Sequence, residues 1–172
     1  MSAAELIDHS DVTGLMQLLR DYGEVERARQ VAEAMWAARP IQTTAALRDL
    51  VAGITRSRGR IHPATQVFQA LRIAVNDELR RLSYALPALM GALAPGGRLA
   101  IITFHSLEDR IVKRAFRAVI AEPEDQPGFG QPVERTGYPM LLMTRKPIEP
   151  TEEEIASNPR ARSAKLRVIE RK

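Results

Sequence analysis

The sequence predicts a mixed α/β fold, in which a helical N-terminal part is followed by a part with about three strands. Apolar residues recur at three- and four-residue steps through the first third, as on one face of a helix. Further along, "RLAIIT", "YPMLLMT" and "SAKLRVIER" are short apolar stretches of strand character. A polar break, "TRSRGR", divides a helical subdomain, residues 1–58, from a strand-bearing domain, residues 59–172.

The helical part is expected to contain three short amphipathic helices. Ser10 would cap the first, which ends near Gly23. The second lies within "EVERARQVAEAMWAARP" and is ended by Pro40, since the residue before a proline avoids helical backbone angles. Thr43 or Thr44 would cap the third.

A longer helix is expected after the break. It begins near Pro63, whose missing N–H costs nothing in a first helical turn. Its apolar residues continue through Leu82 and cover more than one narrow stripe, which predicts burial on several sides. Pro87 separates this helix from the next apolar segment.

The strands are expected to form a largely buried sheet. Four consecutive apolar residues, 99–102, predict a first strand buried on both faces, as in a parallel sheet. In the last strand Leu166 and Val168 share the apolar face, and Arg167 lies outside it. The proline- and glycine-rich residues 121–137 connect the first two strands as a loop.

Charge is mild overall but unevenly placed. The 172 residues carry a net charge of +4. Residues 51–76 hold four arginines and no acid, and residues 156–172 hold six cations against Glu170 alone. Arginine suits bidentate contacts to phosphate, so a polyanion such as RNA is one interpretation and an ordinary solvated surface is the other.

Several classes of site are excluded by the composition. The absence of cysteine rules out disulfides and thiolate metal sites and fits a reducing cytoplasm. No apolar run approaches the ~18 residues of a membrane span, and the acidic start is not a secretory signal. His9, His62 and His105 lie far apart without a metal-ligand spacing, and no glycine-rich phosphate loop occurs.

The most reactive side chains gather where the first strand meets the next helix, in "TFHSLEDR". Helix capping explains part of this, because Ser106 and Asp109 match an S-x-x-D capping box. Capping leaves His105 and Arg110 unexplained, and open α/β sheets bind ligands at the carboxyl ends of their strands. A serine hydrolase is excluded, because adjacent His105 and Ser106 point apart and no nucleophile-elbow pattern is present.

Four separate stretches resemble one family in the right order: "ARPIQTTAALRDLV", "RIHPATQVFQALRIAVNDEL", "LAPGGRLAIITFHSLEDRIVK" and "RKPIEPTEEEIASNPRARSAKLRVIER". They are similar to the bacterial RsmH/MraW family of small-subunit (16S) rRNA cytosine-N4 methyltransferases. The resemblance implies cytoplasmic class I (Rossmann-like) methyltransferases with a helical insertion. Such enzymes transfer a methyl group from S-adenosylmethionine to N4 of a cytosine in 16S rRNA.

The resemblance covers only the C-terminal half of the family. The glycine-rich loop and strands by which members hold S-adenosylmethionine have no counterpart in this sequence, so no cofactor-binding residue is assigned. We expect a partial methyltransferase sheet, a fragment inactive alone, and a first strand left as an edge that invites self-association. The alternative is a non-enzymatic module that binds RNA or another partner.

The resemblance also implies roles for single residues. The expected catalytic residues are His105, Glu108 and Asp109, with the acids orienting the cytosine amine and His105 taking its proton. Phe104, Ser106 and Arg110 would shape the pocket that a flipped base enters. The other expected RNA contacts are His62, Arg160, Arg162 and Lys165, next to Ser163, while Asn76, Asp77 and Glu78 form a second signature of more structural character.

Overall fold

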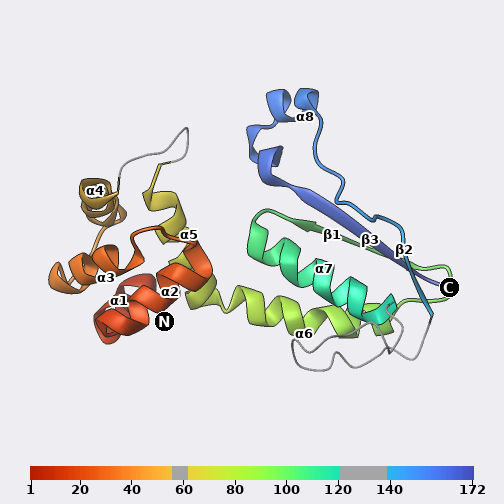
Figure 1. Ribbon diagram of the computed structural model, residues 1–172, viewed down its shortest axis with the longest axis horizontal. Coiled ribbons are helices and arrows are strands. Elements are labelled where there is room, and N and C mark those ends of the chain that lie inside the picture. Colours follow the sequence, from red (N-terminus) through yellow and green to blue (C-terminus); the bar gives the residue numbers. More distant parts are fainter. Residues whose placement is uncertain (56–61, 121–138) are drawn as a thin grey trace. The chain divides into compact units, whose positions relative to one another are not determined.

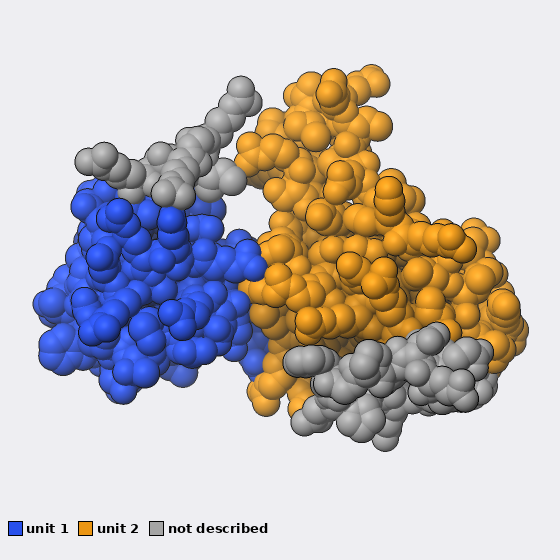
Figure 2. Space-filling view, viewed as in Figure 1, with its two compact units in different colours: residues 1–78 blue, residues 79–172 orange. Residues whose placement is uncertain are grey.

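The computed structural model describes residues 1–55, 62–120 and 139–172 (Figure 1). These residues pack as two compact units, Met1–Glu78 and Leu79–Lys172 (Figure 2). None of the described helices is long and apolar enough to cross a membrane. Each unit has its own hydrophobic core, so each is described separately.

The first unit reaches further along the chain than the helical subdomain expected at residues 1–58. The expected boundary itself and the loop expected at residues 121–137 lie outside the described residues. Helix α5 (Ala64–Asn76) belongs to the first unit, because its buried residues Val67 and Leu71 lie in the same core as the preceding helices. Because α5 is buried in this core, the first unit extends to Glu78.

The described part of the first unit is helical throughout. Its earlier helices are α1 (Ala3–His9), α2 (Val12–Gly23), α3 (Ala28–Ala37) and α4 (Thr44–Ile54). The three expected helices are confirmed as α2, α3 and α4, and Thr43 caps α4 by accepting a 3.1 Å hydrogen bond from the Ala46 N–H. The additional helix α1 is held at its start by a reciprocal capping box between Ser2 and Glu5.

The cap expected at Ser10 is wrong. The Ser10 hydroxyl donates to the Leu6 carbonyl at 2.6 Å and so closes the end of α1. Asp11 caps α2 instead, accepting a 2.7 Å hydrogen bond from the Gly14 N–H. A carboxylate at this position satisfies an unpaired N–H and also complements the positive end of the helix dipole.

The single long helix expected from Pro63 to Leu82 is also wrong. Asp77 adopts the left-handed conformation, φ 54°, and ends α5 by donating its N–H to the Ile73 carbonyl. Helix α6 (Glu78–Gly91) starts directly afterwards and contains Pro87 rather than ending before it. Leu86 and Met90, which flank the proline, are fully buried, so core packing offsets the hydrogen bond that the proline removes.

The second unit is built on a three-stranded sheet in the order β1-β3-β2. Its strands are β1 (Arg98–Thr103), β2 (Met140–Leu142) and β3 (Lys165–Arg171), and its helices after α6 are α7 (Ser106–Ile120), α8 (Glu152–Ser157) and the 3-10 helix η2 (Pro159–Ser163). The three expected strands are confirmed, whereas membership of a Rossmann-like sheet stays a prediction. β1 is an edge strand within the described residues, as expected, and self-association through it stays a prediction.

The expected parallel strand with two buried faces is wrong. β3 pairs antiparallel with both of its neighbours. Helices α6 and α7 cover one face of the sheet, where Phe116 and Ile169 are fully buried in one core (Figure 1). On the opposite face Ile102 is 59% exposed. Four consecutive apolar residues therefore do not establish two-sided burial.

The buried face of β3 is the opposite of the expected one. Arg167 and Ile169 are buried, while Leu166 and Val168 are only partly buried. The register pairs Ile102 with Leu166 on the uncovered face. The inward position of Arg167 reflects an acidic partner on α7, which alternation of apolar residues along one strand cannot reveal.

Candidate functional site

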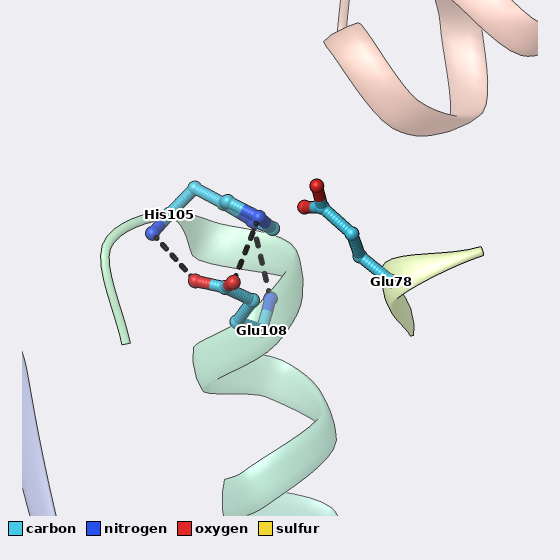
Figure 3. A group of neighbouring side chains, drawn as sticks. All are labelled: Glu78, His105 and Glu108. Atoms are coloured by element: carbon cyan, nitrogen blue, oxygen red, sulfur yellow. Dashed lines mark hydrogen bonds and ion pairs between the residues drawn. The ribbon is translucent and has the colours of Figure 1, made fainter. Parts of the chain in front are cut away.

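The turn from β1 into α7 is fixed by a reciprocal pair of hydrogen bonds between His105 and Glu108 (Figure 3). The His105 ring Nδ1 accepts from the Glu108 N–H at 3.3 Å. Glu108 Oε2 accepts from the N–H groups of Phe104, at 2.9 Å, and His105, at 3.3 Å. This is a capping box in which histidine takes the place of serine or threonine.

The S-x-x-D box expected from Ser106 and Asp109 is therefore displaced by one residue. Ser106 is the first residue of α7, and the Asp109 N–H donates to the His105 carbonyl at 3.2 Å. The helix starts one residue earlier than expected because Glu108 reaches back to two N–H groups, leaving Asp109 available for another contact. Capping accordingly explains His105, which the sequence left unexplained.

The His105 ring is nearly buried, with 9% of its side chain exposed. Since Nδ1 accepts a hydrogen bond, the proton of the neutral ring lies on Nε2. Within the described residues Nε2 is buried and has no hydrogen-bond partner, although Glu108 Oε1 lies 3.3 Å away. Burial raises the pKa of the Glu108 carboxyl, but contacts with the His105 side chain and with the N–H groups of Phe104 and His105 outweigh it and lower that pKa.

Asp109 is bound on both carboxylate oxygens by Arg167 of β3. Arg167 Nε donates to Oδ1 at 2.7 Å, and Nη2 donates to Oδ2 at 3.0 Å. The arginine is 5% exposed, so this pair lies between α7 and the sheet rather than on the surface. The hydrogen bonds from Arg167 lower the pKa of Asp109 despite its partial burial, and Lys165 and Lys113 add to the effect.

The lowered pKa of Asp109 predicts an acid-sensitive contribution to stability. Its carboxylate stabilises the folded state above the unfolded pKa of about 3.9, and this contribution is lost as the pH falls through the lower folded pKa. Urea unfolding at pH 7, 5, 4 and 3 should show the stability gap between the wild type and Asp109→Asn narrowing toward acid. A gap that is constant across this range would contradict the assignment.

The antiparallel register brings the C-terminal basic segment to the same end of the sheet as the junction. Thr103 pairs with Lys165, and the Thr103 hydroxyl donates to the Lys165 carbonyl at 3.3 Å. Lys165 Nζ lies 3.8 Å from Glu149. Arg160 and Arg162 are exposed on η2, which ends two residues before β3 (Figure 1).

Around the junction itself, side chains differ in exposure. Phe104 is 55% exposed, which is unusual for an aromatic side chain directly after a strand. Arg110 and Ser106 are exposed as well, and each interacts with other described residues. The junction thus combines an exposed aromatic ring with a nearly buried imidazole held in one orientation.

The remaining predicted residues belong to the first unit, and two of them bond to near neighbours in the chain. His62 Nδ1 accepts from the Ala64 N–H at 3.2 Å at the start of α5. Asn76 donates to Glu78 at 3.1 Å, and Arg72 binds both oxygens of Glu78. These bonds stabilise the turn at Asp77 that separates α5 from α6, which supports the structural character expected for this signature. Figure 3 draws the side chain of Glu78 at the start of α6.

Comparison with known proteins identifies the family. A family model described as the MraW methylase family matches residues 1–172. The chain belongs to this family. It is 48% identical to the ribosomal RNA small subunit methyltransferase H of Magnetococcus marinus, over 99% of this chain and 56% of that protein. Proteins of the same name from Methylobacterium sp. (strain 4-46), 49% identical, and Nitrobacter hamburgensis, 45% identical, each match over 52% of their length.

The chain spans about half the length of the MraW relatives it matches. Its described residues do not fit S-adenosylmethionine. The adjacent glycines Gly96 and Gly97 precede β1, at the opposite end from the junction. Gly96 donates to the Arg171 carbonyl, and a Cβ on Gly97 would meet the Ala94 carbonyl at 2.8 Å, so both glycines serve the local turn.

Sequence reasoning missed Arg167 as part of this candidate site. It lies in an alternating strand, where a charged residue is normally assigned to the solvent face. The signal in the sequence was the acidic first turn of α7, because it holds two carboxylates, Glu108 and Asp109, whereas a capping box uses only one. A surplus carboxylate beside a sheet indicates a cation on an adjacent strand, but not which one.

Proposed function

We propose that this chain forms the base-binding side of a 16S rRNA methyltransferase that methylates N4 of a cytosine, with S-adenosylmethionine as the methyl donor. The observation that carries the proposal is the capping box at the end of β1, which fixes the turn where the ring of Phe104 is exposed. An exposed aromatic ring at the end of a strand suits a nucleobase that has left its stack.

The chemistry assigns different tasks to these residues than the sequence suggested. The Nε2 atom that carries the proton of neutral His105 is buried, so we assign His105 to holding the turn in place rather than to removing the proton of the cytosine amine. Glu108 holds the N–H groups of Phe104 and His105. Asp109, with both oxygens bound by Arg167, is a positioning residue that fixes α7 on the sheet.

The basic side chains would hold the RNA around the flipped base. Arg110 lies on α7 beyond the capping box, and Lys165 lies at the same end of the sheet. Arg160 and Arg162 complete the proposed phosphate contacts of the second unit, and His62, in the first unit, is proposed as a separate RNA contact. Because the described residues do not fit the methyl donor, no step of the transfer is assigned to them. A cytoplasmic location belongs to the same proposal.

Reconstitution tests this function. By calorimetry the chain alone should not bind S-adenosylmethionine. Combined with the part of the Magnetococcus marinus relative that this chain does not match, it should methylate 16S rRNA in small subunits, read as N4-methylcytosine by mass spectrometry. Phe104→Ala should lower the rate by about tenfold or more, because stacking of a base on an aromatic ring contributes about 1–3 kcal/mol.

Ile148→Ala is the matched control, since Ile148 is also 55% exposed in the second unit. Equal activity of the Phe104→Ala and Ile148→Ala proteins would show that Phe104 does not contribute to base binding. Tight binding of S-adenosylmethionine to the chain alone would contradict the proposal that the methyl donor is held by residues outside this chain. RNA binding without methylation by the combined halves would favour the non-enzymatic module.

A further inference from the structure

Helix α7 carries four cations on one exposed face. Arg110, Lys113, Arg114 and Arg117 are spaced by three and four residues, and all four are exposed. The opposite side of the helix holds Val112 and Phe116, both fully buried. No acid interrupts the four positions, so the outer face of α7 is a continuous positive stripe.

Three cations of the stripe differ from several other exposed arginines of the chain. Arg29, Arg48 and Arg98 each lie within 2.9 Å of a carboxylate. Among the described residues no salt bridge joins Lys113, Arg114 or Arg117 to an acid. Like charges three and four residues apart destabilise an isolated helix. The repulsion among these cations is a cost that a bound polyanion would relieve.

Helix α6 lies beside α7 and packs into the same core through Leu86 and Met90 (Figure 1). On the side of α6 opposite Leu86, the helix exposes Arg81 and Tyr84. Tyr84 is 74% exposed, which is the largest exposure of any described aromatic side chain. The helical layer thus carries an unburied aromatic ring as well as the stripe.

We propose that the outer face of the α6–α7 layer binds a single strand of RNA next to the base-binding junction, which rests on the proposed function for the identity of the ligand. The α7 cations contact phosphates, and Tyr84 stacks on an unpaired base. The stripe starts at Arg110, directly after the capping box, and runs for about 10 Å along the helix. The combination of cations with an exposed aromatic ring favours single-stranded RNA over an acidic protein surface.

The test is binding of the 172-residue chain to a fluorescent single-stranded oligonucleotide of 16S rRNA sequence, followed by anisotropy across a salt series. Lys113→Gln, Arg114→Gln and Arg117→Gln together should lower affinity at least tenfold. They should also reduce the slope of log affinity against log salt by about 2–3, since each lost phosphate contact removes ~0.7–0.9. The matched control replaces exposed Arg20, Arg29 and Arg48 with glutamine and changes the net charge equally.

Tyr84→Ala separates stacking from charge. It should weaken binding several-fold with the salt slope unchanged, while Leu89→Ala, 44% exposed on the same helix, should have no effect. Circular dichroism confirms that each variant is folded. The proposed RNA-binding surface would be overturned if the two triple variants lost RNA affinity equally, or if the α7 triple variant bound RNA like the wild type. It would also be overturned if polyglutamate competed for the chain as strongly as RNA does. If the combined halves bind RNA but do not methylate it, the proposed function is overturned and the RNA-binding surface is not.

Discussion

Arg167→Ala should destabilise the second unit by about 3–5 kcal/mol, because it leaves the Asp109 carboxylate partly buried without its partner. Side-chain exposure is 6% for the arginine and 14% for the aspartate, so water cannot replace the lost bonds. The same two hydrogen bonds join α7 to β3 and thereby orient the whole junction. Urea unfolding followed by far-ultraviolet circular dichroism measures the change.

Arg98→Ala is the matched control. Arg98 also pairs with a carboxylate of the sheet, Glu170 at 2.6 Å, but its side chain is 63% exposed. An exposed pair contributes about 0–1 kcal/mol, so this variant should unfold almost like the wild type. Similar losses for Arg167→Ala and Arg98→Ala would contradict the view that burial makes the Asp109–Arg167 pair important.

Gly23→Ala should destabilise the first unit by about 1–3 kcal/mol through overpacking. A Cβ at this position would lie 2.6 Å from the Gln66 carbonyl oxygen and 3.1 Å from the Ala70 Cβ, both on α5. Since the carbonyl belongs to a helix backbone, it cannot move aside as a flexible side chain does. Fluorescence of Trp36, which belongs to the first unit, reports the unfolding midpoint in urea.

Gly53→Ala makes the same chemical change but should raise the stability of the first unit. Gly53 lies in α4, and a Cβ there meets nothing within 4 Å. The extra methyl group restricts the unfolded chain and favours the helix, so stability should rise by about 0.5–1 kcal/mol. The prediction fails if the two alanine variants change stability in the same direction, because the close approach of α2 and α5 would then not matter.

Capping and proposed base binding use the same residues, so they are not competing explanations. A box made of His105 and Glu108 starts α7 as a serine box would, and it also holds the turn that exposes Phe104. Replacing His105 with serine would preserve the cap and remove the imidazole.

The sequence by itself determined the features that depend on neighbouring residues. Helical spacing, the cap at Thr43 and three apolar strand segments are encoded within a few residues, and four separate motif stretches, "FHSLEDR" among them, indicated the MraW family. Caps and helix breaks were less certain where two acceptors compete, as at Ser10 and Asp11, or where a left-handed residue such as Asp77 interrupts an apolar pattern.

Only the tertiary structure decided which side of each strand is buried and which charges meet. Arg167 faces inward because Asp109 of α7 covers it, and Ile102 faces outward because no described helix covers that side. Both outcomes depend on residues far away in the chain, whose pairing is set by packing and not by local pattern. For the same reason the cations of α7 became visible as one surface only when the helix showed which of its sides is buried.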